Sequence, residues 1–133
     1  MARTAKAASS KAELTHPSTE VIVVNGVPVS TRSTGSGDPV ILLNRFRGTL
    51  DTWDPAFVAA LASRHGVMMF DSLGIGETGG HTPATVEATA DFAARVIEAM
   101  EFQSPAILGC SLGGFVAQVL AITRPKLLGS WFL

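Results

Sequence analysis

The residues of this chain best suited to chemistry are Ser111 and its neighbours, in the stretch Gly109-Cys110-Ser111-Leu112-Gly113. In this G-x-S-x-G pattern a serine stands between two glycines, which leave room for a sharp turn. An apolar, strand-like run ends at 109 and a helix-like run follows at once. A serine at such a junction lies beside free backbone N–H groups that stabilise an oxyanion. The spacing predicts a nucleophile for acyl transfer, and a small-residue turn without chemistry is the alternative.

A serine nucleophile needs a base, usually a histidine that is oriented by a carboxylate. After Ser111 the sequence contains no Asp, Glu or His. We expect His16, His65 and His81 to be surface or helix-terminal residues rather than bases. We expect Cys110, one position before the serine, to point into the core as an inert small hydrophobe. We predict no metal site.

Alternating strand-like and helix-like segments must position these residues. The run 20–33, with Asn25-Gly26 at its middle, predicts an antiparallel hairpin. Short apolar runs that begin at Val40, 67 and 105 predict buried parallel strands, and a further strand begins within 127–133. Helices are expected over 54–66, 83–100 and 111–124. This order predicts an α/β fold, in which the hairpin leads into a mainly parallel sheet with helices on both faces.

Composition sets limits on the class of protein. A chain of 133 residues with 47% hydrophobic residues and a net charge of -1 is typical of one globular domain. It offers no basic surface for nucleic acid or anionic membrane, and no apolar run nears the ~20 residues that cross a bilayer. One cysteine fits a reducing compartment, so we expect a cytoplasmic protein. Residues 1–19 predict a disordered tail, with an organellar transit peptide as the alternative.

Three segments resemble the first half of an α/β-hydrolase of the branch that contains esterases, prolyl aminopeptidases and cofactor-free haloperoxidases. "GDPVILLNRFRGTLDTWDP" (37–55) resembles the third strand and the following loop, which commonly carries a His-Gly pair. "FDSLGIGETGG" (70–80) resembles the F-D-x-x-G-x-G-x-S segment. "GCSLGGFVAQVLA" (109–121) resembles the nucleophile elbow and is the most specific of the three.

The resemblance implies that Ser111 Oγ attacks an ester, thioester or amide carbonyl of a small molecule, without a cofactor. The backbone N–H of Leu112 would be one oxyanion donor and that of Phe46 the other. This chain has Asn44-Arg45 where the family commonly has His-Gly, so the second donor could lie one residue to either side. Asn44 could brace the loop, and Arg45 and Arg47 could face solvent. A serine rather than an aspartate at the elbow argues against dehalogenase or epoxide hydrolase chemistry.

The resemblance covers residues 20–133 and implies a partial domain, cut in or before its sixth strand. The acid and base of a catalytic triad would then lie outside it, since Asp71 resembles a residue that chiefly supports its loop. A sheet cut at a central strand exposes an unpaired edge, so we expect residues 1–133 alone to be inactive, poorly soluble and prone to self-association.

Two other functions stay open at this stage. "GIGETG" (74–79) matches the dinucleotide-binding pattern G-x-G-x-x-G, but residues 81–83 separate it from the next helix and no acidic residue follows at the end of a next strand. The second is a non-catalytic binding or scaffold protein on the same fold, because a fold alone does not determine function.

Overall fold

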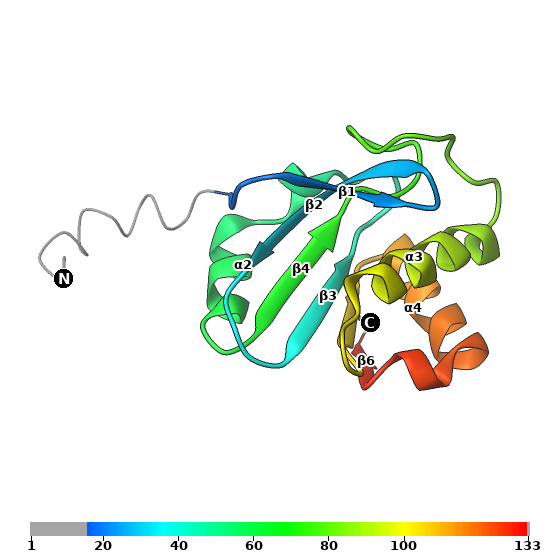
Figure 1. Ribbon diagram of the computed structural model, residues 1–133. Helices are drawn as coiled ribbons and strands as arrows, with labels where there is room; N and C mark the ends of the chain where they lie inside the picture. The colour runs from blue at the N-terminus through cyan, green and yellow to red at the C-terminus, as the bar shows by residue number, and fades with distance from the viewer. Residues whose placement is uncertain (1–15, 133) are drawn as a thin grey trace, which may run out of the picture.

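The computed structural model describes residues 16–132, in which six strands form one sheet flanked by helices (Figure 1). The strand order is β1-β2-β4-β3-β5-β6. β1 pairs with β2, and β2 with β4, in antiparallel fashion, whereas the other neighbours are parallel. This confirms the predicted α/β class. The elements are β1 Glu20–Val24, β2 Val27–Thr34, β3 Pro39–Leu43, the 3-10 turn η1 Leu50–Thr52, α2 Pro55–Ala62, β4 Gly66–Phe70, α3 Val86–Met100, β5 Ala106–Gly109, α4 Leu112–Thr123, the 3-10 turn η2 Pro125–Leu127 and β6 Ser130–Phe132.

The β1–β2 hairpin turns at the predicted pair. Asn25 has φ 49° and Gly26 has φ 79°, and Val24 lies opposite Val27 in the register. Two central residues with positive φ give a turn whose twist matches that of the flanking strands, and asparagine and glycine adopt this conformation at the lowest cost. The antiparallel start of the sheet is therefore encoded locally.

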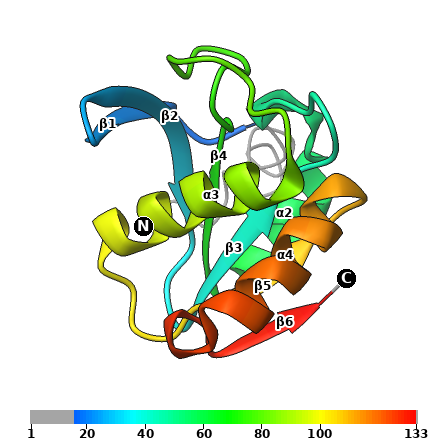
Figure 2. The ribbon, with the colours of Figure 1, turned by 90° about the vertical axis from the view of Figure 1, so that its right-hand side faces the viewer.

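The parallel strands bury both faces, as their continuous apolar sequences predict. Alternate side chains of a strand point to opposite faces of the sheet. Ile41 and Ile107 pack with α3 and α4 on one face, whereas Leu42 and Met69 pack with Val58 of α2 on the other. Figure 1 shows α2 on one side of the sheet and α3 and α4 on the other, and Figure 2 shows the sheet from the α3–α4 side.

Two helices differ from their predicted limits because polar side chains fix their ends. The helix predicted from Pro83 begins at Val86, since Thr85 is extended and its hydroxyl accepts the N–H of Ala88 at 3.1 Å. The helix predicted to reach Gly66 ends at Ala62, and the Ser63 hydroxyl just beyond it donates to a carbonyl of the last turn at 2.6 Å. Because α3 begins only at Val86, residues 83–85 belong to the loop that precedes it.

Most of the predicted N-terminal tail, and with it the transit-peptide alternative, falls on residues 1–15, which lie outside the described residues. Residues 16–19 form neither helix nor strand. Over the described part of the chain, no helix has the length and apolar character that crossing a membrane requires.

Candidate active site

Ser111 occupies a turn between β5, which ends at Gly109, and α4, which begins at Leu112. Its backbone has φ 54° and ψ -115°, which is outside the regions that non-glycine residues favour, and its side chain is exposed. The hydroxyl makes no capping hydrogen bond to α4, so its hydrogen-bonding groups are not occupied by that helix. The junction thus holds a free hydroxyl beside a helix N-terminus.

Gly109 and Gly113 bring the strand and the helix closer together than side chains would allow. A Cβ on Gly109 would collide with the carbonyl of Gly113, and a Cβ on Gly113 would collide with the carbonyl oxygen of Leu43 in the neighbouring strand. The N–H of Cys110 donates to that same Leu43 carbonyl at 3.0 Å. The two glycines therefore let the start of α4 pack directly on the ends of β3 and β5.

The prediction that Cys110 is buried in the core is wrong, because its side chain is exposed. The alternation along β5 gives the reason. Ile107 faces the α3–α4 core, whereas Ala106 and Leu108 pack at the margin of the α2 core. Cys110 continues the second set, and α2 packs against β4. The described residues leave this side of the elbow uncovered.

The loop after β3 is held together by the Asn44 side chain. Its Nδ2 donates to the Thr49 carbonyl at 2.7 Å, and its Oδ1 accepts the N–H of Arg45 at 2.9 Å. A Cβ on Gly48 would collide with this side chain, and the N–H of Gly48 donates to the Arg45 carbonyl at 2.9 Å. Asn44 braces the loop, as its position suggested.

The same bonds decide which N–H groups of this loop remain free. Those of Arg45 and Gly48 have acceptors, whereas that of Phe46 has no backbone acceptor within residues 16–132. The N–H of Leu112, at the first position of α4, likewise has none in the described chain. The two sequence-predicted donors, Phe46 and Leu112, therefore both retain a free N–H among the described residues, and so does Arg47, the residue after Phe46.

A cavity of about 170 Å³ opens beside the elbow, at the carboxyl ends of β3 and β4. Ser111 stands outside its wall, which begins at the next residue, Leu112. The floor is apolar, and the rim comes from the loop after β3 and from the segment before α3. The lining residues are Leu42–Gly48, Phe70, Ser72, Ile75, Thr82–Val86, Thr89, Ala93, Leu112, Gly113 and Val116.

Sequence analysis did not predict that residues 82–86 line the cavity, because it assigned Pro83 onward to a helix. The signal that could have found it is the capping residue Thr85, since a threonine whose side chain accepts an N–H three residues later marks a helix start. The four residues from Thr82 to Thr85 therefore belong to the rim of the cavity.

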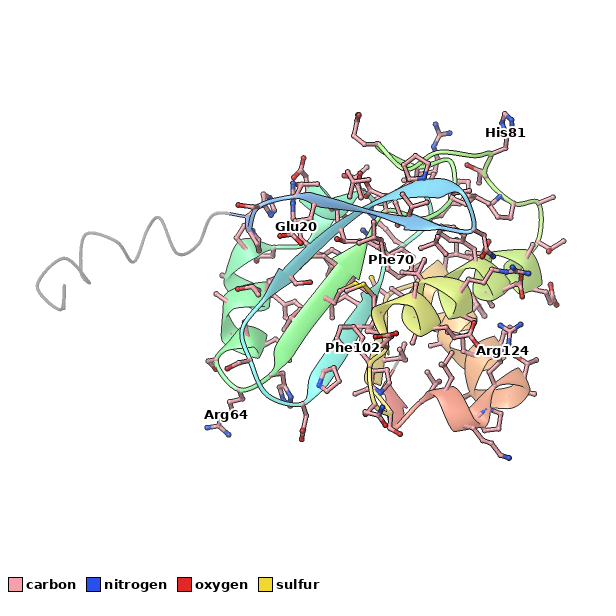
Figure 3. The ribbon with its side chains drawn as sticks, in the orientation of Figure 1. Glu20, Arg64, Phe70, His81, Phe102 and Arg124 are labelled. Carbon is pink, nitrogen blue, oxygen red and sulfur yellow. The ribbon has the colours of Figure 1, made fainter. Side chains whose placement is uncertain are left out.

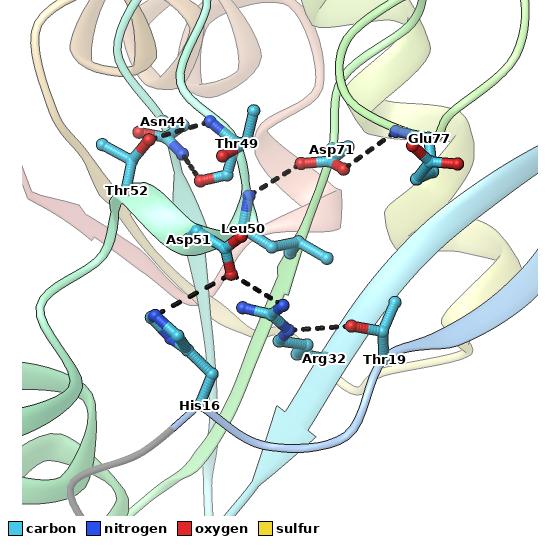
Figure 4. Close-up of polar contacts among 10 residues, drawn as sticks. All are labelled: His16, Thr19, Arg32, Asn44, Thr49, Leu50, Asp51, Thr52, Asp71 and Glu77. Atoms are coloured by element: carbon cyan, nitrogen blue, oxygen red, sulfur yellow. Dashed lines mark hydrogen bonds and ion pairs between the residues drawn. The ribbon is translucent and has the colours of Figure 1, made fainter.

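Asp71 links the two loops that border the cavity (Figure 4). It is buried, and its Oδ1 accepts the N–H of Leu50 at 2.8 Å while its Oδ2 accepts that of Glu77 at 3.4 Å. Burial raises the pKa of Asp71 above its ordinary value of 3.8, and the two amide hydrogen bonds lower it by less. Asp71 does not line the cavity. Its contacts are those of a loop support.

The three histidines lie away from the elbow. His16 approaches Asp51, with Nε2 to Oδ1 at 3.8 Å, beside the Arg32–Asp51 ion pair at 2.8 Å (Figure 4). His65 precedes β4, at the amino ends of the parallel strands. His81 is exposed on the loop after β4 (Figure 3). Within residues 16–132, no histidine lines the cavity.

The loop that contains the dinucleotide-like glycines differs from a phosphate-binding turn. The N–H of Gly74 donates to the Gly79 carbonyl at 2.9 Å, so the glycines close a loop on themselves. The next helix begins only at Val86. Dinucleotide binding requires the glycine-rich turn to lead directly into a helix, and these glycines do not.

Comparisons with known proteins point to one family. A family model described as alpha/beta hydrolase fold matches residues 38–132. The chain is 34% identical over 97 residues to a protein named "Putative non-heme bromoperoxidase BpoC" of Mycobacterium tuberculosis, covering 72% of this chain and 37% of that one. It is 31% identical over 93 residues to a "Putative carbamate hydrolase RutD" of Azorhizobium caulinodans, covering 69% and 35%. The matched region therefore spans little more than a third of the length of these relatives.

Solved structures agree with this family match. An alpha/beta hydrolase fold protein from Chitinophaga pinensis superposes with a TM-score of 0.82 at 37% identity, over 87% of this chain and 42% of that one. The strand order and the mixed sheet thus match part of a larger domain of this kind.

Proposed function

The chain belongs to the alpha/beta hydrolase fold family, and from this premise we propose that it carries the nucleophile of a serine hydrolase. Ser111 Oγ attacks the carbonyl carbon of an ester, thioester or amide of a small molecule. The alcohol, thiol or amine leaves, and water then cleaves the acyl-serine bond to release the acid and restore the hydroxyl. The observation that carries the proposal is an exposed serine with φ 54° at a strand-to-helix turn beside a cavity.

The oxyanion that forms in this reaction would accept hydrogen bonds from the free N–H groups of Leu112 and Phe46. Both residues line the cavity, and the first also lies at the N-terminus of α4, where the helix dipole favours negative charge. Such donors act strongly because they are oriented before the reaction begins. Asn44 would orient the second donor through its two hydrogen bonds within the loop.

A general base must accept the Ser111 proton, and we propose that it lies outside the described residues. The histidines at 16, 65 and 81 contact other regions or solvent. The relatives are much longer than this chain, and in this fold the acid and base follow the nucleophile in the sequence.

A fluorophosphonate probe tests the proposal directly, because it reacts much faster with an activated serine than with an ordinary one. In the protein expressed from its complete gene, we expect one label, on Ser111, and at least a roughly 100-fold slower reaction in Ser111→Ala. Cys110→Ala is the matched control, since that side chain is exposed one position away and should leave labelling unchanged.

Two results would contradict the proposal. Labelling of Ser111→Ala at the original rate would assign the nucleophile to another residue. Absence of label in the folded wild-type protein, with its circular dichroism spectrum intact, would favour a non-catalytic binding protein on the same fold.

A further inference from the structure

The lining of the cavity beside the elbow includes two exposed arginines and no acidic residue of the described chain. Arg45 and Arg47 both line it, on either side of Phe46, whereas no Asp or Glu of the described chain does. The chain as a whole carries a net charge of -1. This concentration of positive charge is therefore a local property of the cavity.

The two arginines have no carboxylate partner within residues 16–132. By contrast, Arg32 pairs with Asp51, and Arg95 and Arg124 share Asp91. The Arg45 guanidinium donates to the Phe46 carbonyl at 3.0 Å, which holds it at the rim and leaves its remaining N–H groups free. Arg47 follows with φ 60°, in the same turn.

Two helix N-termini add to this positive charge. Thr85 and Val86 at the start of α3, and Leu112 at the start of α4, line the cavity. The N-terminal end of a helix attracts anions, so the dipoles act in the same sense as the arginines. The nearby acids lie outside the cavity lining. Glu87 of the first turn of α3 does not line the cavity, and the Asp71 carboxylate is bound by two backbone N–H groups.

We infer that this cavity selects substrates whose acyl part carries a carboxylate, which Arg45 and Arg47 bind while Ser111 attacks the ester carbonyl. Arginine suits this role because its planar guanidinium matches a carboxylate with two parallel hydrogen bonds. The apolar floor, which includes Phe70 and Val116, would hold the methylene chain between the two ends. The inference rests on the proposed function, because it names the substrate class of the same site.

Monomethyl adipate and dimethyl adipate form a matched pair of substrates that differ mainly in one negative charge. With protein from the complete gene, we expect a higher kcat/KM for the monoester at about 0.05 M NaCl. The ratio should fall as salt is raised to about 0.5 M, because ions screen exposed charges. In the double variant Arg45→Gln/Arg47→Gln we expect the ratio to fall about tenfold.

Two further variants separate charge from structure. The double variant Arg45→Lys/Arg47→Lys keeps the charge and should retain part of the preference for the monoester. Arg64→Gln removes an exposed arginine at the opposite end of the molecule from His81 and its loop, and should leave the ratio unchanged (Figure 3).

Fluorophosphonate labelling of Ser111, measured on each variant, distinguishes the two possible failures. A labelled wild-type protein that prefers the diester, hydrolyses neither ester, or keeps its ratio in the Gln double variant overturns the inference alone. A wild-type protein that is not labelled overturns the proposed function, and the inference with it.

Discussion

The sheet passes into a helix twice on the α3–α4 face, and the two junctions are built differently. β5 reaches α4 through residues 110–111, whereas β4 reaches α3 through residues 71–85. In the long junction every positive φ falls on a glycine, at 74, 76 and 80, whereas in the short one it falls on Ser111. A strained non-glycine backbone costs about 1–3 kcal/mol, which glycine would avoid. The backbone conformation at position 111 would favour glycine, yet the short junction has a serine there.

The two junctions also differ in what holds them. The long loop is held by hydrogen bonds. The Asp71 carboxylate accepts the N–H groups of Leu50 and Glu77, and the Thr78 hydroxyl donates to the Asp71 backbone carbonyl at 2.8 Å. The elbow instead depends on the absence of side chains at Gly109 and Gly113. Added atoms should therefore disturb either junction, since a Cβ on Gly74 or Gly76 would also collide with its surroundings. Removal of a polar side chain should disturb the long loop alone.

The largest effect is expected from Gly113→Ala. Its Cβ would meet backbone atoms of Leu43 and Asn44, which cannot move without disturbing the sheet. We expect the free energy of unfolding to fall by about 3 kcal/mol or more. Urea denaturation of the protein expressed from its complete gene measures this.

Gly26→Ala is the matched control for that substitution. Nothing lies within 4 Å of its Cβ position, but its φ is +79°, so only backbone strain is added. We expect a loss of about 1 kcal/mol. If Gly113→Ala cost no more than Gly26→Ala, close packing would not be what holds the elbow.

A smaller effect is expected from Asp71→Ala, which removes the acceptor for two N–H groups. We expect a loss of about 2 kcal/mol, because relief from burying a carboxylate offsets part of the lost hydrogen bonding. Asp71→Asn keeps an oxygen for the Leu50 N–H and should lose about 1 kcal/mol. Equal stability of the Ala variant and wild type would show that the long loop is held by other contacts.

The pH dependence of this pair follows from the pKa of Asp71. Burial raises that pKa above 3.8, so the folded protein binds the proton more tightly than the unfolded chain does. Compared with the Asp71→Asn variant, the stability that the aspartate contributes is complete below pH 3.8 and falls as the pH rises through the folded-state pKa. The stability gap between wild type and this variant should therefore shrink as the pH rises from 3.8 through the folded-state pKa, and a widening gap would contradict this sign.

Sequence analysis succeeded where local residue types decide the structure. The Asn25-Gly26 turn, the continuous apolar strands and the Gly-x-Ser-x-Gly junction each specify their own geometry. It failed for Cys110, because exposure depends on which face of β5 a helix covers, and for residues 83–85, because a capping side chain overrode a proline start signal. The arginine-lined cavity depends on segments far apart in the chain, so no local pattern predicts it.

The smallest effect concerns Ser111 itself and tests whether the elbow stores strain. Ser111→Gly relieves a positive φ but adds entropy to the unfolded chain, so we expect it to be about 1 kcal/mol more stable than Ser111→Ala. At Ser63, with φ -65°, the order should reverse, with alanine more stable than glycine. Both pairs are compared by urea denaturation. If alanine were also the more stable residue at 111, the elbow would be relaxed, and a serine there would need no functional explanation.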